Sequence, residues 1–471
     1  MKNSLSLFLL IFSFSVWAEF SFPKEFDFGL ASAPAQSEDQ LNDSWMLFGD
    51  SGNIPGFRNT IRPKDKLMFW SNPEVEISWL EKSNISLYRL GVDWQRIMPD
   101  KNKFDEKALD QYEALLKTLK EKQFKIMLTL VHHSLPIWVE KQGGWLHPET
   151  IRDFNQFSKI VYERFHPYVD FWITFNEPQI FAILSYQMGL WPPFEKRSFF
   201  ANLDLGFLYR GAVIKALHFM SEAHTDFYNW AHEQNPLNKI GIAHHMGYHS
   251  GKTLINKLVS TFTGHFMNWD FPSRIEGKMD FFGINYYGAE WVNHFNITLE
   301  PDEEYSEAGR AVYPQGLYFL LQDIHDEYPS LPIMITENGF SDSTDQLRPS
   351  YMIEHLAAVH QAIEDGIPVQ SYIWWTLSDN FEWSDGYCPK FGLLDVNRAQ
   401  DLKRIPRESF FLFSEIAKEK TITDSMRKSS WKKVKASQGK PRPFCRAEDG
   451  IGALAIPRER KVVKKDWRFS F

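Results

Sequence analysis

Two glutamates in this sequence stand where paired carboxylates could do acid–base chemistry. Glu177 lies in the segment Thr-Phe-Asn-Glu-Pro at 174–178, and Glu337 lies in Ile-Thr-Glu-Asn-Gly at 335–339. A lone glutamate at the end of an apolar run is ordinarily a cap or a surface charge. Two carboxylates about 5–5.5 Å apart are instead the equipment of a retaining glycosidase, in which one attacks the anomeric carbon and the other moves the proton.

These two roles need different pKa values for the two carboxyl groups. The nucleophile must stay ionised, which a neighbouring cation achieves, and Arg89 near the end of the apolar run 86–93 is the candidate cation. The acid must stay protonated, which burial and nearby negative charge achieve.

The elements that must position these side chains are eight strand-like runs separated by amphipathic helical stretches. The runs are 26–33, 86–93, 124–131, 169–176, 239–246, 281–288, 332–338 and 369–376. Helical periodicity is found in 105–122, 150–166, 206–233, 314–328, 350–365 and 406–419. Eight alternations of nearly continuous apolar strands with helices predict an α/β fold of the (β/α)8 TIM-barrel type, a single domain enlarged by loop insertions. The alternative, an open doubly wound sheet, lacks a glycine-rich phosphate loop after the first strand.

The predicted fold also predicts where the active site lies, because active sites of (β/α)8 barrels are found at the carboxyl ends of the strands. Glu177 ends the fourth predicted strand and Glu337 ends the seventh. The adjacent pairs at 132–133 and 244–245 are histidines whose side chains diverge on a strand, so no metal site is predicted from them.

Composition excludes several classes of protein. With 43% hydrophobic and 24% charged residues the chain is not disordered, and no nucleic-acid-binding motif accompanies its charge. Its two cysteines, Cys388 and Cys445, exclude a disulfide scaffold and leave open whether they form one bridge or none.

The two ends of the chain differ from the predicted barrel at 19–425. Residues 1–18 combine Lys2, an apolar run and a small-residue cleavage site, which predicts a signal peptide and export to the periplasm or the medium. An uncleaved anchor is the alternative. The extension 426–471 is basic and contains aromatic residues: the net charge is +10 from residue 427 onward and −18 before it. This tail could contact anionic membranes peripherally or fold back onto the acidic body.

The motifs around both glutamates resemble those of glycoside hydrolase family 1. Further matches follow in order along the chain: Gln36 and Glu38, Tyr88-Arg89, His132, Gly143-Gly144-Trp145, Asn285-Tyr286-Tyr287, Trp375 and Asp379-Asn380-Phe381-Glu382-Trp383. The resemblance implies a retaining β-glycosidase on a (β/α)8 barrel that acts by double displacement and needs no metal or organic cofactor.

The resemblance also implies a role for each matching residue. Glu337 would be the nucleophile and Glu177 the acid/base, with Arg89 and Tyr287 keeping Glu337 charged. The expected substrate-binding residues are Gln36, His132, Asn176, Asn285, Trp375, Glu382 and Trp383. The substrate would be a β-glucoside or a β-galactoside, and the carboxylate of Glu382 argues against 6-phosphorylated sugars.

Several segments are similar to a plant subgroup of the family that transfers galactose between galactolipids. They are 33–39, 132–136, 305–310, 442–447 and 466–469. Gln36 departs from that subgroup, and His133 departs from ordinary β-glucosidases. Hydrolysis and transglycosylation, the latter on a galactolipid, therefore both stay open. A catalytically silent carbohydrate- or lipid-binding barrel is the alternative of another class, against which the intact Glu177, Glu337, Arg89 and Tyr287 argue.

Overall fold

The computed structural model describes residues 19–50, 66–193, 211–293, 296–448, 450 and 452–470. The predicted signal peptide at 1–18 lies outside the described residues, as do the first five residues of the helix predicted at 206–233.

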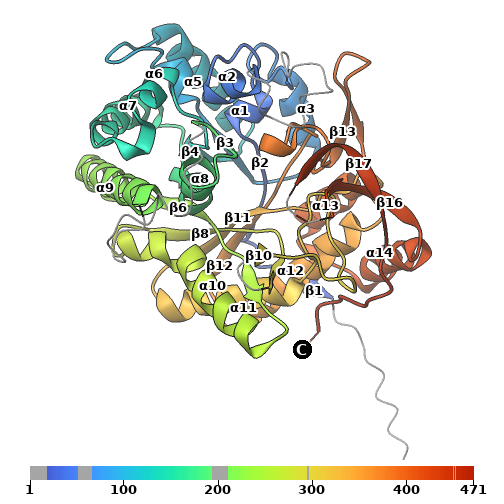
Figure 1. Cartoon of the computed structure of the whole chain (residues 1–471). Coiled ribbons are helices and arrows are strands. Elements are labelled where there is room, and N and C mark those ends of the chain that lie inside the picture. Colours follow the sequence, from blue (N-terminus) through green and yellow to red (C-terminus); the bar gives the residue numbers. More distant parts are fainter. Residues whose placement is uncertain are drawn as a thin grey trace, which may run out of the picture.

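Eight parallel strands close into a barrel, surrounded by helices (Figure 1). The strands are β2 (Asp27–Ala31), β3 (Leu87–Gly91), β4 (Lys125–Val131), β5 (Phe171–Asn176), β6 (Ile240–His245), β8 (Phe281–Tyr286), β11 (Ile333–Asn338) and β12 (Val369–Trp374). Pairing of β12 with β2 closes the ring. All eight predicted runs contain one of these strands, and the predicted (β/α)8 fold is confirmed. Nearly every strand residue is buried, which explains why the runs are apolar without alternation.

The six helices predicted from periodicity are present. They are α5 (Glu106–Glu121), α7 (Glu149–Phe165), α9 (Gly211–Gln234), α11 (Pro314–Glu327), α12 (Arg348–Glu364) and α13 (Glu408–Glu419). Helix α5 shows why they form: the Asp105 side chain accepts hydrogen bonds from the backbone N–H groups of Lys107 and Ala108, and the apolar face of the helix is buried.

Shorter elements decorate this frame, mostly in the connections between strands and helices. The helices are α1 (Pro34–Ser37), α2 (Ser44–Asp50), α3 (Glu74–Lys82), α4 (Trp94–Ile97), α6 (Ile137–Lys141) and α8 (Pro178–Tyr186), with 3-10 turns at Gly144–Leu146 and Trp383–Asp385. The strands are β1 (Phe20–Ser21), β7 (Tyr248–Ser250), β9 (Ala289–Asn293), β10 (Asn296–Ile297), β13 (Leu394–Asn397), β14 (Lys403–Pro406) and β15 (Thr421–Ile422).

Helix α10 (Leu254–Arg274) is absent from the helices predicted from the sequence. Three of its large apolar side chains, Leu254, Ile255 and Leu258, are more than 60% exposed. Because these residues lie on the solvent side, the sequence does not show the apolar stripe on one face that marks an ordinary surface helix. In the part of the chain that the structure describes, no helix has the length and apolar character needed to cross a bilayer.

The basic C-terminal extension folds back onto the barrel. It forms helix α14 (Asp424–Ser437) and an antiparallel hairpin of β16 (Pro441–Arg446) and β17 (Ala453–Lys461). The fully buried carboxylate of Glu354 on α12 accepts hydrogen bonds from Arg427 Nε at 2.8 Å and from Trp431 Nε1 at 2.7 Å. Arg442 donates to the buried Glu304 at 2.6 Å. Of the two arrangements left open by the sequence, the structure shows packing onto the acidic body.

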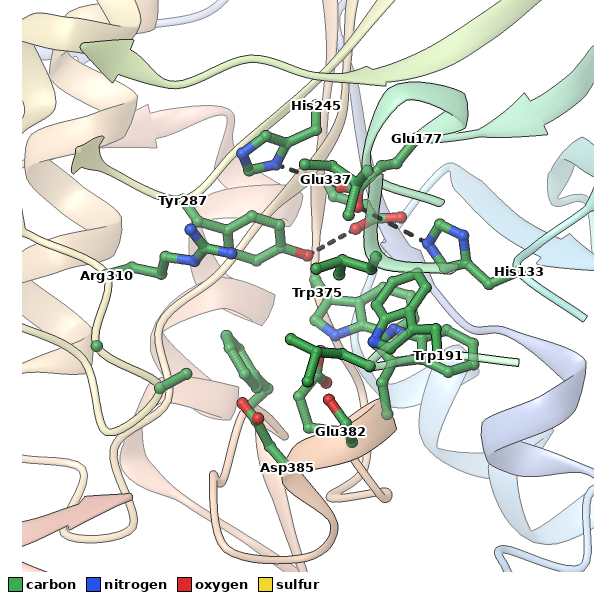
Figure 2. Close-up of a pocket in the computed structure, with 18 of the residues that line it drawn as sticks. His133, Glu177, Trp191, His245, Tyr287, Arg310, Glu337, Trp375, Glu382 and Asp385 are labelled. Carbon is green, nitrogen blue, oxygen red and sulfur yellow. Dashed lines mark hydrogen bonds and ion pairs between the residues drawn. The ribbon is translucent and has the colours of Figure 1, made fainter. Parts of the chain in front are cut away.

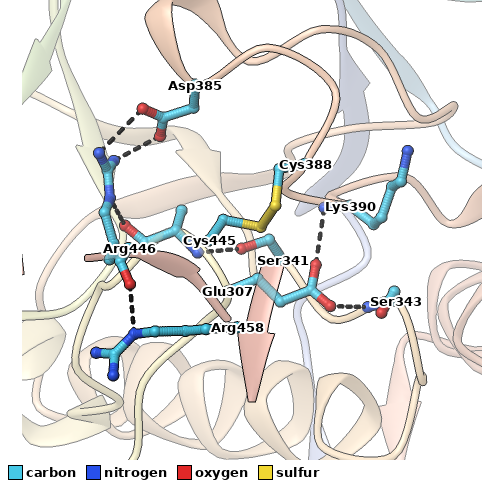
Figure 3. Close-up of a disulfide and its surroundings, with 10 residues drawn as sticks. Glu307, Ser341, Ser343, Asp385, Cys388, Lys390, Cys445, Arg446 and Arg458 are labelled. Atoms are coloured by element: carbon cyan, nitrogen blue, oxygen red, sulfur yellow. Dashed lines mark hydrogen bonds and ion pairs between the residues drawn. A yellow bond between two sulfur atoms is a disulfide. The ribbon is translucent and has the colours of Figure 1, made fainter. Parts of the chain in front are cut away.

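A disulfide between Cys388 and Cys445 fastens the hairpin to the loop that follows β12 (Figure 3). The question left open by the two cysteines is thus settled in favour of a bridge. Beside it, the Arg446 guanidinium makes a two-pronged ion pair with Asp385, and the Cys445 N–H donates to the Glu307 carbonyl oxygen at 2.8 Å. These contacts bring the extension to the mouth of the barrel.

Candidate active site

A pocket of about 410 Å³ opens at the carboxyl ends of the barrel strands, within the size range of small-molecule sites. Both glutamates singled out by the sequence line it, Glu177 after β5 and Glu337 near the end of β11 (Figure 2). Six other predicted site residues also line it: His132, Asn176, Tyr287, Trp375, and the adjacent pair Glu382 and Trp383.

Glu337 is held by a cation and a hydroxyl, as expected for a nucleophile. Arg89 Nη1 lies 2.6 Å from its Oε1, and the Tyr287 hydroxyl donates to its Oε2 at 2.6 Å. Burial raises the pKa of Glu337 to about 7, while Arg89 and Tyr287 act in the opposite direction and favour its ionised form.

Glu177 stands at a sharp turn between β5 and α8. Its backbone is left-handed, with φ 44°, and Pro178 begins the helix directly after it. Asn285 Nδ2 donates to its Oε1 at 2.9 Å. His245 Nδ1 lies 3.5 Å from the same oxygen, and His133 Nε2 lies 3.7 Å from Oε2.

Two asparagines connect the two carboxylates. Asn176 Oδ1 accepts hydrogen bonds from Arg89 Nη2 at 2.6 Å and from Asn285 Nδ2 at 3.0 Å. The Asn285 Oδ1 accepts from Thr336 Oγ1 at 2.7 Å. The resemblance led us to expect that Asn285 binds substrate. Instead, both its amide nitrogen and its amide oxygen make hydrogen bonds within the protein that hold Glu177 and its neighbours in place.

The remaining predicted sugar-binding residues lie in or next to the pocket: His132, Trp375 and Trp383 line it, and Gln36 lies beside Glu382, which also lines it. The His132 ring centre is 5.7 Å from those of Trp375 and Trp383, so aromatic surfaces can cover the C–H side of a sugar. Gln36 is fully buried, and its Nε2 donates to the Phe381 carbonyl oxygen at 2.7 Å. Its Oε1 is buried and has no partner among the described atoms, which is unusual for a buried acceptor.

Two residues linked to the Glu177 carboxylate were missed from the sequence: His245, which contacts it, and Glu290, which contacts His245. The side chains of the pair at 244–245 diverge as expected, with His244 Nε2 facing the Met267 carbonyl oxygen and His245 facing Glu177 (Figure 2). His245 Nε2 lies 3.6 Å from Oε1 of the buried Glu290 on β9. His245 could have been identified as a site residue by its position at the carboxyl end of a barrel strand, the criterion that identified Glu177.

The contacts between Glu177 and its neighbouring histidines shift the pKa values of Glu177 and His245 in the directions opposite to those that burial alone would give. Burial by itself raises the pKa of Glu177, but contacts with His133 and His245 outweigh burial and hold that pKa well below its ordinary value. Burial lowers the pKa of His245, but Glu177 and Glu290 outweigh it and raise the pKa to about 9. Both directions favour a proton on His245 over one on Glu177, so the proton that an acid catalyst needs lies one contact away from Glu177.

This arrangement predicts the alkaline limit of activity. The Glu177–His245 pair keeps one proton up to about pH 9, so kcat/KM for an aryl β-glycoside should fall only near that pH. In His245→Gln the proton resides on Glu177 alone and is lost at the lower pKa of a carboxyl group, so the alkaline limb should move toward acid. His232→Gln is the matched control, since His232 pairs with Asp280 just before β8. An unmoved limb in His245→Gln would contradict the shared proton.

A barrel with a glutamate at the end of two strands, both lining one pocket, has the arrangement of an enzyme that cleaves glycosidic bonds. The chain belongs to glycosyl hydrolase family 1, whose family model matches residues 19–259 and 266–422. This confirms the family suggested by the sequence motifs.

Among its relatives, the chain is 37% identical over 511 residues to the galactolipid galactosyltransferase SFR2 of Arabidopsis thaliana, covering 94% of this chain and 82% of that protein. It is 39% identical over 439 residues to the beta-glucosidase-like SFR2 of Oryza sativa, covering 89% and 67%. The structure of a beta-glycosidase from Pyrococcus horikoshii matches with a TM-score of 0.78 and 28% identity, covering 88% of this chain and 98% of that one.

Proposed function

We propose that this family 1 β-glycosidase uses Glu337 as its nucleophile and Glu177 as its acid/base. The observation that carries the assignment is the contrast between their surroundings. Glu337 is fixed by Arg89 and Tyr287, which favour its charge, whereas Glu177 faces His245, whose pKa is raised to about 9. One group is thus prepared to attack and the other to exchange a proton.

In the first step, a Glu337 oxygen attacks the anomeric carbon and the bond to the leaving oxygen breaks. Glu177 passes the proton held by its pair with His245 to that oxygen, and a glycosyl ester of Glu337 remains. In the second step, Glu177 takes the proton of an incoming hydroxyl, whose oxygen attacks the anomeric carbon and frees Glu337. Water as the incoming group gives hydrolysis, and a sugar hydroxyl gives transfer.

The substrate that the pocket suits is a β-galactoside or β-glucoside with an apolar aglycone. Ile180 and Leu184 of α8, together with Met188, Leu190 and Ile297, form an apolar wall of the pocket. A diacylglycerol end would lie against such a wall more favourably than in water. The name of the Arabidopsis relative, a galactolipid galactosyltransferase, supports a galactolipid as the substrate.

The test is incubation of the purified protein with monogalactosyldiacylglycerol, followed by analysis of lipid and soluble products. Oligogalactolipids indicate transfer and free galactose indicates hydrolysis. A barrier difference of about 1.4 kcal/mol between the two acceptors changes their ratio tenfold. Absence of both products, with an aryl β-glucoside cleaved normally, would remove galactolipids from the proposal. Absence of all turnover, equal in wild type and Glu337→Ala, would favour a silent binding barrel.

We also propose that the protein is exported. The basis in the sequence is the signal-like segment at 1–18, and the Cys388–Cys445 bridge supports it, because such bridges persist in oxidising compartments. N-terminal sequencing of the exported protein should begin at Glu19. A protein found only inside reducing compartments would contradict the proposal.

We also propose that the extension contacts anionic membranes through lysines that remain exposed after it packs on the barrel. Lys432 and Lys435 are exposed and line a groove with Arg427 and Trp431. Replacing both lysines with glutamate should weaken co-sedimentation with anionic liposomes. The contacts of Arg427 and Trp431, which hold the extension on the barrel, are left intact by these substitutions. Unchanged sedimentation would mean that the extension serves packing alone.

A further inference from the structure

Arg310 lies on the wall of the catalytic pocket with part of its hydrogen-bonding capacity uncommitted. It lines the same cavity as both carboxylates, across the pocket from His133 in Figure 2. Its Nη1 donates to Oε1 of the buried Glu290 at 2.9 Å, and the side chain is 36% exposed. Among the described residues, no side-chain hydrogen bond of Arg310 other than the one from Nη1 is found, so its Nε and Nη2 are left for a ligand in the pocket that Arg310 lines.

The loop that carries Arg310 is held rigidly. The Ser306 N–H donates to the Arg310 carbonyl oxygen at 2.8 Å, and the Ser306 hydroxyl accepts from the Arg310 N–H at 3.2 Å. Gly309 has a φ of +79°, and a Cβ at this position would lie 2.8 Å from Arg446 Cγ. The loop therefore needs a glycine here, and it is braced by the C-terminal extension. Because the loop is already ordered, the Arg310 donor loses less conformational entropy when it binds a ligand.

The charges on this wall are balanced. Arg310 is matched by Glu290, and Arg446 is matched by Asp385. A wall with little net charge favours a neutral polyhydroxylated ligand over a phosphate or sulfate. Met188 and Leu190, which also line the pocket, are 40% and 43% exposed, so an apolar group attached to that ligand also finds a surface.

We propose that Arg310 binds the sugar that accepts the glycosyl group, a neutral glycoside with free hydroxyls. The inference rests on the proposed function, since it requires the glycosyl ester of Glu337. One acceptor hydroxyl oxygen attacks the anomeric carbon, the bond to the Glu337 oxygen breaks, and the hydroxyl proton goes to Glu177. Arg310 takes no part in these bond changes, but its free N–H groups donate to other hydroxyl oxygens of the acceptor and hold it against the ester.

The experiment measures how the glycosyl group divides between water and a defined acceptor. An aryl β-galactoside is the donor, methyl β-galactoside at fixed concentration is the acceptor, and disaccharide and free galactose are quantified. Both products come from one intermediate, so their ratio does not depend on how fast that intermediate forms. In Arg310→Ala the ratio of disaccharide to galactose should fall about tenfold, which corresponds to about 1.4 kcal/mol and to the size of one hydrogen bond to a charged group.

Two variants guard against a purely structural effect. Arg310→Lys keeps a cation beside Glu290 but loses the planar fork, and the ratio should fall in it as well. Arg274→Ala removes an arginine paired with Asp270 on α10, and its ratio should equal that of wild type. An unchanged ratio in Arg310→Ala would overturn the proposal, as would a wild type that cleaves the donor but never forms disaccharide. Preference for glycerol 3-phosphate over methyl β-galactoside would refute the neutral acceptor, whereas failure to cleave any aryl β-glycoside refutes the proposed function itself.

Discussion

Glu337→Ala should lower kcat for an aryl β-galactoside or β-glucoside by about 10⁴-fold or more, since removing the nucleophile prevents the covalent route. Arg89 would then lack the carboxylate that it contacts at 2.6 Å, but the barrel should remain folded. The measurement is steady-state turnover, together with the intact mass of the wild-type enzyme after reaction with a slow 2-fluoro glycoside. That mass should increase by one sugar, and the label should lie on the peptide containing Glu337.

Tyr287→Phe is the graded control for this prediction. It removes only the hydroxyl that donates to Glu337 Oε2 at 2.6 Å, and the loss of activity should be about 10- to 100-fold. A Glu337→Ala protein that retains more activity than Tyr287→Phe, or a label found on another peptide, would show that Glu337 is not the nucleophile.

Glu177→Ala should lose about 10²- to 10⁴-fold in rate for substrates with poor leaving groups and much less for activated aryl glycosides. The reason is that an activated leaving group departs without a proton, so the glycosyl ester still forms. Sodium azide should then restore turnover, because the small anion fits the space vacated by the carboxylate and attacks the ester without a general base. The measurement is the appearance of a β-glycosyl azide.

Glu177→Gln is the matched variant. Its amide fills the space and keeps a hydrogen-bonding partner for Asn285, but it cannot accept the proton of the incoming group. Azide should rescue it poorly compared with Glu177→Ala. Equal rescue in both variants, or none in a normally folded Glu177→Ala, would argue against Glu177 as the acid/base.

The barrel and both glutamates could be predicted because each depends on local sequence. A strand buried on both faces must be apolar throughout, and a residue at its carboxyl end then falls at the mouth of the barrel. Arg89 and Tyr287 followed from the same reasoning and from family resemblance, and the structure places both on Glu337.

What the sequence did not indicate depends on contacts between distant segments. The raised pKa of His245 depends on its contacts with Glu177 and with Glu290, which belongs to the later strand β9. Whether the basic extension folds back onto the body stayed open because its partners, Glu354 and Glu304, are remote along the chain. Pairing of the two cysteines likewise needed coordinates, since they are 57 positions apart in the sequence.

The bracing of Gly309 by Arg446 has a consequence for protein engineering. The family match ends at residue 422, so the last 49 residues look dispensable in a domain swap. Yet they border the cleft and limit which residue the facing loop can carry. A chimera that grafts this cleft onto another barrel would have to transplant the C-terminal segment and the 305–310 loop together, as one unit.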